Sequence, residues 1–206
     1  MVDSPLSDPA DLNSRTVAVV LAAGAGSRFA ASHHKLLADF RGKPVLAWAV
    51  EAPVTAGFVA TVVVAGAVPA ATLGTHLEAW LSTPSLCFVD NPRWDEGQST
   101  SLQVGVAAAR DLGAEAIVVG LGDQPLVGPV SWRAVAAAST PIAICSYDGR
   151  MQPPVLLHRS VWPLLPIAGD FGARHLIRLH PELVSPVVCT DNPIDIDTVE
   201  DLRRWN

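Results

Sequence analysis

Two cations follow the chain's most apolar run after a stretch with almost no side chains. Residues 17–29 read VAVVLAAGAGSRF, so a β-branched run passes into small residues and glycines before Arg28, and Lys35 comes next. Bare backbone lets a ligand approach the amide N–H groups closely, and phosphate is the anion that most often uses such a loop. Arg28 and Lys35 would neutralise its charge. The pattern predicts a phosphate-binding loop, and an ordinary tight turn is the alternative.

Carboxylates follow two other apolar runs. Asp123 comes two residues after the run 116–121, within Gly122-Asp123-Gln124-Pro125, with no polar residue between them. Desolvation of a carboxylate in that position is costly unless the group is paired, and Mg²⁺ prefers one or two carboxylates together with phosphate oxygens. Asp195 or Asp197 would face Asp123 if the strand before them were central. Helix capping is the alternative for each, with Asp123 as an N-cap and residues 197–200 as a capping box.

Two polar segments combine glycines with functional side chains. They read NPRWDEGQSTS at 91–101 and GDFGAR at 169–174. Arg174 offers paired donors to a phosphate, and the glycines let backbone come close. We expect both segments to form the acceptor side of one cleft, within a ligand's length of Asp123 and on the side away from residues 22–26. The alternatives are that Trp94 only closes the core and that Asp170 only fixes Arg174.

The first part of the chain alternates strands and helices. Strand-like apolar runs are 17–21, 59–65, 86–89, 116–121 and 142–145, and the helical stretches are 44–52, 70–81, 99–113 and 129–138. This order predicts an α/β fold of three layers, with a mostly parallel mixed sheet covered on both faces. Ligands bind beyond the carboxyl ends of such strands. The polar clusters at 24–28, 90–101 and 122–125 all fall there.

The remaining elements are less regular. Residues 153–157 predict an edge or antiparallel strand, because two prolines argue against a central position in the sheet. Residues 171–180 and 198–205 predict helices, and residues 184–189 predict a strand.

Composition narrows the class of protein. Of the 206 residues, 50% are hydrophobic, which is enough for one core. We therefore expect a single domain over 15–206. Residues 1–14 before it are expected to form a flexible tail that is neither a signal peptide nor a membrane anchor. The net charge of −6 argues against binding to nucleic acid or an anionic membrane. Cys87, Cys145 and Cys189 show no C-x-x-C spacing, which is typical of free thiols in a reducing cytoplasm.

Together these segments resemble the molybdenum cofactor nucleotidylyltransferases, which are the molybdopterin cytidylyl- and guanylyltransferases. The motifs, in the family's order, are LAAGAGSRF with KLL at 35–37, NPRWDEGQSTSL at 91–102, GDQP at 122–125, PPVL at 153–156, GDFGAR at 169–174 and DIDTVED at 195–201. They extend from about residue 16 to the end of the chain. The first motif is common among nucleotidyltransferases, whereas the second, third and fifth together are far more specific. The resemblance implies a Rossmann-like nucleotidyltransferase fold and Mg²⁺ as cofactor.

The resemblance also implies roles for individual residues. Arg28, Lys35 and Asp123 are the implied catalytic residues, and Asp123 and Asp197 the implied metal ligands. The nucleotide-binding set is Leu21, Ala22, Ala23, Gly24, Ala25, Gly26, Ser27, Arg28, Lys35, Asn91, Ser99 and Gly122. The acceptor-binding set is Trp94, Gln98, Ser101, Gln124, Asp170 and Arg174.

Two details bear on the substrate. Ala23 adds a methyl group where guanylyl members carry glycine, and the motif is GDQP rather than GDMP, so CTP is favoured over GTP. Two departures affect the first loop: Ala30 stands where the family has glycine, and the interval from Arg28 to Lys35 is longer than usual.

The expected reaction is transfer of CMP, or less readily GMP, to the phosphate of a molybdopterin-type acceptor, with release of pyrophosphate. A molybdoenzyme or its chaperone is a further partner that the resemblance suggests. The alternatives are another phosphorylated acceptor (a sugar phosphate, methylerythritol phosphate or phospholactate), a nucleotide-binding regulator without catalysis, and an NAD-dependent oxidoreductase. The last is weakened because the loop lacks the third glycine of G-x-G-x-x-G.

Overall fold

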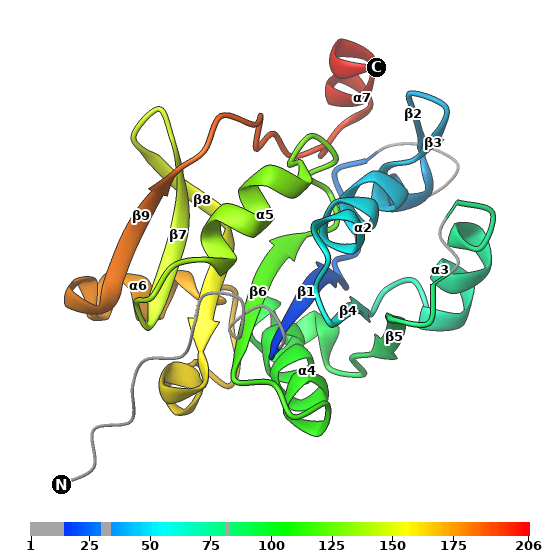
Figure 1. Cartoon of the computed structure of the whole chain (residues 1–206). Coiled ribbons are helices and arrows are strands. Elements are labelled where there is room, and N and C mark those ends of the chain that lie inside the picture. Colours follow the sequence, from blue (N-terminus) through cyan, green and yellow to red (C-terminus); the bar gives the residue numbers. More distant parts are fainter. Residues whose placement is uncertain (1–14, 30–33, 81–82) are drawn as a thin grey trace, which may run out of the picture.

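A seven-stranded sheet runs through the centre of the computed structural model, which describes residues 15–29, 34–80 and 83–206 (Figure 1). The strands are β1 (Thr16–Ala22), β4 (Ala60–Ala65), β5 (Leu86–Asp90), β6 (Ala116–Leu121), β7 (Ile142–Tyr147), β8 (Arg150–His158) and β9 (Val184–Val188). Their order is β5-β4-β1-β6-β8-β7-β9. Four neighbouring pairs are parallel and the two that involve β8 are antiparallel, which confirms the predicted mixed, mostly parallel sheet. The predicted tail at 1–14 lies outside the described residues.

The strand with two prolines, β8, is antiparallel as predicted, but it lies between β6 and β7 inside the sheet. The expectation that prolines keep it out of a central position is therefore wrong. The pairing of β8 with β6 ends at Val155, and its register with β7 shifts so that Ile144 faces Val155 while Cys145 faces Gln152. Pro153 and Pro154 fall in this bulge, where no N–H is needed for the ladder.

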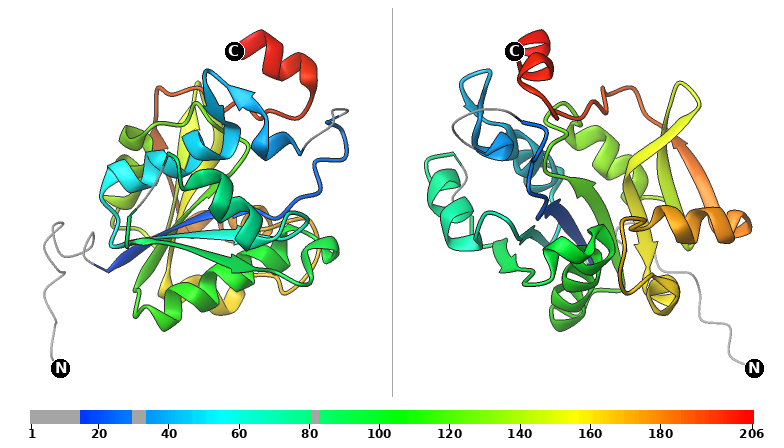
Figure 2. Two further views of the ribbon diagram at one scale, coloured as in Figure 1. Left: turned by 90° about the vertical axis from the view of Figure 1, so that its right-hand side faces the viewer. Right: turned by 180° about the vertical axis from the view of Figure 1, so that it is seen from behind.

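Helices cover both faces of the sheet (Figure 2). On β1, Ala18 and Val20 face α2 (Val45–Ala56), α3 (Ala70–Leu77) and α5 (Pro129–Ala136). Val17 and Val19 face α4 (Gln98–Asp111) and α6 (Arg174–Leu179). These four β1 side chains are all fully buried. The uninterrupted apolar run therefore reflects a strand that is packed on two sides.

Some predicted helix ends differ from the observed ones. α3 and α5 end at Leu77 and Ala136, before the predicted 81 and 138, and Leu81 itself lies outside the described residues. α6 begins at Arg174 rather than at 171, because Gly169 and Gly172, with φ of 89° and 49°, form a turn before it.

A third apolar cluster fastens the C-terminal segment beside the loop that follows β1. Ile196 is fully buried against Phe29, Phe40 and Val45, and Trp205 of α7 (Val199–Trp205) packs on the same cluster. Phe40 belongs to a hairpin of β2 (Asp39–Phe40) and β3 (Lys43–Pro44). The packing brings residues 195–197 across the sheet from its β9 edge to the carboxyl end of β6.

The described residues contain no helix long and apolar enough to cross a membrane. Cys87, Cys145 and Cys189 are free thiols, as predicted, although the sulfur atoms of Cys145 and Cys189 lie in contact at 2.6 Å.

Candidate active site

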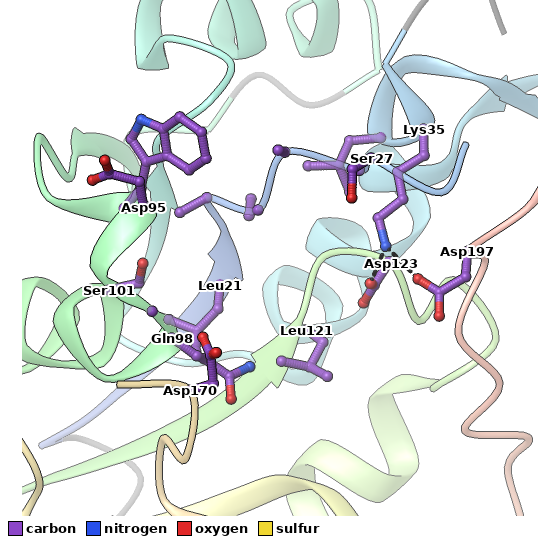
Figure 3. Close-up of a pocket in the computed structure, with 18 of the residues that line it drawn as sticks. Leu21, Ser27, Lys35, Asp95, Gln98, Ser101, Leu121, Asp123, Asp170 and Asp197 are labelled. Carbon is purple, nitrogen blue, oxygen red and sulfur yellow. Dashed lines mark hydrogen bonds and ion pairs between the residues drawn. The ribbon is translucent and has the colours of Figure 1, made fainter. Parts of the chain in front are cut away.

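One cleft of about 480 Å³ opens beyond the carboxyl ends of β1 and β6 (Figure 3). Sixteen of the twenty predicted site residues line it. They are Leu21, Ala22, Ala23, Gly24, Ala25, Gly26, Ser27, Arg28, Lys35, Trp94, Gln98, Ser101, Asp123, Asp170, Arg174 and Asp197. One end of the cleft holds Lys35, Asp123 and Asp197. The other end holds Asp95, Gln98, Ser101 and Asp170, and Leu21 and Leu121 lie between the two ends.

Local hydrogen bonds hold the loop after β1 in place. The Phe29 amide donates to Gly26 O at 2.9 Å, where Gly26 has φ 62°, and the Ala67 amide donates to Ala23 O at 3.0 Å. His34 also contacts this loop. Its Nδ1 accepts a hydrogen bond from the Leu36 amide, so the proton of the neutral ring is on Nε2, which donates to Gly24 O at 3.0 Å. Burial lowers the pKa of His34, which favours this neutral form. Sequence reasoning missed His34, since a histidine with no partner in the sequence gives no signal.

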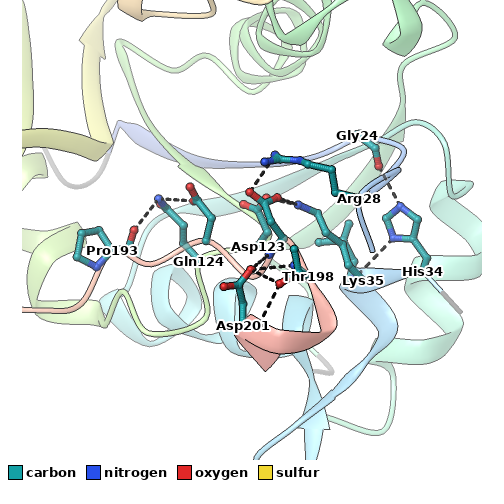
Figure 4. Close-up of polar contacts among 12 residues, drawn as sticks. Gly24, Arg28, His34, Lys35, Asp123, Gln124, Pro193, Thr198 and Asp201 are labelled. Carbon is teal, nitrogen blue, oxygen red and sulfur yellow. Dashed lines mark hydrogen bonds and ion pairs between the residues drawn. The ribbon is translucent and has the colours of Figure 1, made fainter. Parts of the chain in front are cut away.

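Lys35 is the more enclosed of the two cations in the site. Its Nζ lies 2.6 Å from Asp123 Oδ2 and 2.8 Å from Asp197 Oδ1, and its side chain is only 10% exposed (Figure 4). Burial alone lowers the pKa of Lys35, but the charges and hydrogen bonds of the two carboxylates outweigh burial and raise it. Arg28 Nη2 lies 2.9 Å from Asp197 Oδ2 with a side chain that is 73% exposed. The two cations thus converge on the two predicted metal ligands.

Asp123 and Asp197 reach this position from distant parts of the chain. The Ile196 amide donates to Asp123 O at 2.9 Å, which joins the C-terminal segment to the end of β6. β9 is an edge strand rather than a central one, so Asp197 faces Asp123 only because the chain crosses the sheet after β9. The N-cap alternative for Asp123 is wrong, because the next helix, α5, begins at Pro129 with Gly128 as its N-cap.

The capping box at α7 is one residue away from its predicted place. Thr198 is the N-cap, and Asp201 rather than Glu200 completes the box. The Asp201 carboxylate accepts from the Thr198 amide and hydroxyl at 2.9 and 2.8 Å, and the hydroxyl accepts from the Asp201 amide at 3.1 Å. Asp197 is therefore not needed as a cap, and its carboxylate is left for Lys35 and Arg28.

The donor chemistry fits a magnesium ion. Asp123 and Asp197 place carboxylate oxygens on the cleft, and Mg²⁺ prefers such ligands together with phosphate oxygens. Within the described part of the chain, no group of three or more His, Cys, Asp or Glu side chains could hold a metal unaided. A metal here would therefore complete its coordination with oxygens of water or of a ligand.

The 91–101 segment lies beside the loop after β1. A Cβ atom added to Gly66 would meet both Trp94 Cβ at 2.6 Å and Ala23 Cβ at 2.7 Å, so these two residues flank the end of β4 closely. The expectation that this segment lies on the side away from residues 22–26 is wrong. The cause is strand order, because β5 follows β4 and β4 is the direct neighbour of β1.

The 169–174 segment is joined to the beginning of α4. The Ser99 amide donates to Gly169 O at 2.9 Å, and Ser99 Oγ accepts from the Gly172 amide at 3.2 Å. A side chain at Gly97 would collide with the Gly169 carbonyl carbon at 2.4 Å. Among the described residues, Asp170 and Arg174 form no ion pair with each other, so the alternative role for Asp170 is not observed.

Four predicted residues do not line the cleft. Asn91 is buried and donates to Thr100 and Ser101, and buried Ser99 makes the contacts described above. Gly122 packs where a Cβ would come within 2.9 Å of Leu46. Buried Gln124 donates to Asp195 Oδ1 at 2.9 Å and to Pro193 O at 3.2 Å. These residues hold the walls of the cleft in position.

Known proteins share this architecture. The chain matches the family described as the MobA-like NTP transferase domain over residues 18–185. It is 30% identical over 200 residues to nicotine blue oxidoreductase of Paenarthrobacter nicotinovorans, covering 90% of this chain and 94% of that one. The crystal structure of Rv0371c from Mycobacterium tuberculosis H37Rv superposes on this chain with a TM-score of 0.77 at 28% identity, covering 93% of this chain and 97% of that one. Rv0371c has also been solved in complex with manganese. A nucleotidyl transferase from Methanothermobacter thermautotroptrophicus (Mth528) gives a TM-score of 0.75 at 26% identity, covering 92% and 95%.

The three-layer fold and its charged cleft therefore define a nucleotidyltransferase-like α/β protein. More particularly, the chain belongs to the MobA-like NTP transferase domain family.

Proposed function

We propose that this protein transfers a nucleotidyl group from a nucleoside triphosphate to a phosphorylated small molecule and releases pyrophosphate. The observation that carries the proposal is the convergence of Arg28 and Lys35 on Asp123 and Asp197, beside a loop of nearly bare backbone in one cleft. An acidic protein that binds triphosphate needs such a local group of cations.

Each group has a part in the proposed reaction. The 22–27 backbone approaches the triphosphate, and Arg28 and Lys35 bind its oxygens in place of the carboxylates that they contact here. Asp123 and Asp197 would hold Mg²⁺, which when bound neutralises charge that develops on the phosphates. An acceptor phosphate oxygen forms a bond to the α-phosphorus while the bond to the β-phosphate oxygen breaks. This chemistry needs positioning and charge stabilisation rather than a protein nucleophile.

The finer assignment is transfer of CMP to a molybdopterin-type acceptor in the cytoplasm. Ala23 lines the cleft beside Trp94, and a methyl group at this position would leave less space for a purine than glycine does. Because Trp94 lies next to this loop, we assign it to the base end of the cleft rather than to the acceptor. Gln98, Asp170 and Arg174 remain the acceptor candidates along its wall. The manganese complex of the 28% identical Rv0371c supports a divalent metal in this family.

A second candidate function is an oxidoreductase that uses a nicotinamide dinucleotide. It is favoured by one observation, the name of the 30% identical relative, which matches nearly the whole chain. The cleft offers cations for a dinucleotide's phosphates as readily as for a triphosphate. The absence of the third glycine of G-x-G-x-x-G argues against it.

Pyrophosphate release tests the proposal and separates the two candidates. Each of the four common nucleoside triphosphates is supplied with Mg²⁺, with and without a molybdopterin-type acceptor, and NADH binding is followed by its fluorescence. We expect release with CTP that requires acceptor, and loss of release by a factor of 100 or more in Asp123→Asn, since a lost metal ligand costs about several kcal/mol of transition-state stabilisation.

The matched control is Asp148→Asn. Asp148 is an exposed aspartate in the β7–β8 turn with φ 49°, a conformation that asparagine also tolerates. A folded Asp123→Asn protein with normal release would overturn the proposal, and NADH binding without release would favour the oxidoreductase.

A further inference from the structure

His34 makes a hydrogen bond from each nitrogen of its ring (Figure 4). Its Nδ1 accepts from the Leu36 amide at 3.3 Å, so His34 is the N-cap of the 3₁₀ turn at Lys35–Leu37. Its Nε2 donates to Gly24 O at 3.0 Å, ten residues earlier in the chain. One ring therefore joins the turn that carries Lys35 to the loop after β1, and the proposed function gives this ring no role.

A second histidine shows what capping alone requires. His158 is the N-cap of the 3₁₀ segment at Arg159–Leu164, and its Nδ1 accepts from the Ser160 amide, also at 3.3 Å. The φ angles of the two capping histidines are −66° and −68°. Among the described residues, the Nε2 atom of His158 has no hydrogen-bond partner. The bond from His34 to Gly24 is therefore an addition to the cap and not a part of it.

The bond to Gly24 O fixes one peptide plane of the loop. A peptide unit is planar and trans, so the Ala25 N–H points away from the Gly24 C=O. Because His34 holds that carbonyl, the Ala25 N–H is directed away from the ring. In the part of the chain that the structure describes, this N–H has no acceptor, and Ala25 is exposed and lines the cleft. It can therefore donate to an anion there.

The ring also packs against the loop. A Cβ atom at Gly26 would lie 3.2 Å from His34 Nε2 and 3.2 Å from Lys35 Cγ, which is closer than side chains usually approach. Gly26 has φ 62°, a conformation that glycine adopts without strain. The side chains of His34 and Lys35 thus lie against the same residue of the loop, and this packing fixes the position of Lys35 relative to the loop.

We infer that His34 is a positioning residue for the triphosphate. By holding Gly24 O, it directs the Ala25 N–H to a phosphate oxygen and keeps that amide at a fixed position relative to Lys35. This role belongs to the Nε2 donor, whereas the Nδ1 acceptor only caps the turn. The inference rests on the proposed function for the identity of the ligand, but it can be tested by binding without catalysis.

Two substitutions separate the two nitrogens. Asparagine places its amide group near the position of Nδ1, so His34→Asn keeps an acceptor for the cap and loses the donor to Gly24. Glutamine is one methylene longer and places its amide near the position of Nε2, so His34→Gln keeps the donor and loses the cap. His158→Asn is the matched control, because His158 caps with the same geometry outside the cleft.

Titration calorimetry of the full-length protein measures the Kd of CTP and of inorganic triphosphate, each with Mg²⁺, and urea denaturation measures stability. We expect His34→Asn to raise both Kd values about fivefold, as loss of one hydrogen bond does, and to leave the denaturation midpoint unchanged. His34→Gln should keep both Kd values within twofold of wild type and lower the midpoint. His158→Asn should change neither quantity.

A role in capping alone would give the opposite pattern, because triphosphate affinity would then follow the denaturation midpoint. The inference would be overturned by a triphosphate Kd that His34→Asn leaves unchanged. It would also be overturned if His34→Gln raised that Kd as much as His34→Asn does. The ratio of the Kd for GTP to that for CTP should be the same in every variant, since the bond acts on the phosphates rather than on the base.

The outcome is separable from that of the proposed function. Binding of inorganic triphosphate that depends on His34, without release of pyrophosphate from any nucleotide, would keep the positioning role and end the transferase proposal. Release of pyrophosphate together with an unchanged triphosphate Kd in His34→Asn would do the reverse. A wild-type protein that binds neither CTP nor inorganic triphosphate would overturn both.

Discussion

Lys35 and Arg28 contact the same carboxylate from different environments, so their removal should have different effects. Lys35 is almost enclosed, and Lys35→Met would leave Asp123 without its cation and Asp197 with Arg28 alone. We expect it to lower the free energy of unfolding by about 1–3 kcal/mol, the usual cost of an unsatisfied buried group. Arg28 is 73% exposed, so Arg28→Ala should leave stability unchanged and reduce kcat/KM for the triphosphate.

Chemical denaturation of both variants checks this contrast. The pKa of Lys35 is raised in the folded protein, so its ion pairs stabilise the fold fully at any pH below the ordinary lysine pKa of 10.5. This stabilisation is lost as the pH rises through the higher pKa of the folded state. The difference between wild type and Lys35→Met should therefore be constant across neutral pH. An Arg28→Ala protein that unfolds as easily as Lys35→Met would contradict the assignment.

Ala23 is the residue at which base preference should be adjustable. Its side chain and that of Trp94 flank Gly66 at the wall of the cleft, and Ala23→Gly would remove the methyl group that we propose restricts a purine. One methyl group in a pocket is worth about 1–3 kcal/mol, so the ratio of kcat/KM for CTP to that for GTP should fall without inverting fully. Steady-state kinetics with both nucleotides measures it. A wild-type protein that prefers GTP would show the argument to be wrong.

At the scale of elements, α7 holds Asp197 in place through its first turn. The Thr198 hydroxyl donates to the Asp201 carboxylate, and this hydrogen bond is the main cause of the lowered pKa of Asp201. Asp201→Asn keeps an oxygen acceptor but replaces charge-assisted hydrogen bonds with weaker neutral ones, so it should cost about 1 kcal/mol of stability at pH 7. Since the pKa is lowered, this stabilisation is present above the ordinary value of 3.8 and disappears as pH falls through the folded value.

Thermal unfolding at pH 7 and pH 3 tests the cap. The difference between wild type and Asp201→Asn should be clear at pH 7 and smaller at pH 3. Glu200→Gln is the control, because Glu200 lies in the same turn outside the capping box and should behave as wild type at both pH values. An equal loss in both variants would mean that charge near the helix end, rather than the cap, is responsible.

The elements that sequence predicted well are those whose cause is local. β1 and β6 are buried on both faces, so their apolar runs identify them, and the small residues after β1 identify the loop. Strand order is not local. It places β8 inside the sheet despite Pro153 and Pro154, and it places Trp94 beside Ala23. The Lys35 contacts with Asp123 and Asp197 span 88 and 162 residues, so only the folded chain brings them together.

At the scale of the whole molecule, the candidate site joins the two ends of the described chain, so a bound ligand should stabilise all of it. The loop after β1 and the 195–197 segment meet at Asp123, and Ile196 is buried in the cluster that holds both. A ligand at 100 times its Kd adds about 2.7 kcal/mol to stability. For a chain of this size that corresponds to a rise in Tm of about 5–10 °C.

Thermal shift therefore provides a test that needs no acceptor. CTP with Mg²⁺ should raise Tm more than GTP with Mg²⁺, and NADH should have no effect. In Asp123→Asn the metal-dependent part of the shift should be lost, while Asp148→Asn should respond as wild type does. A larger shift with NADH than with any triphosphate would show that this cleft serves a dinucleotide, because the ligand that the folded state binds best stabilises it most at equal concentration.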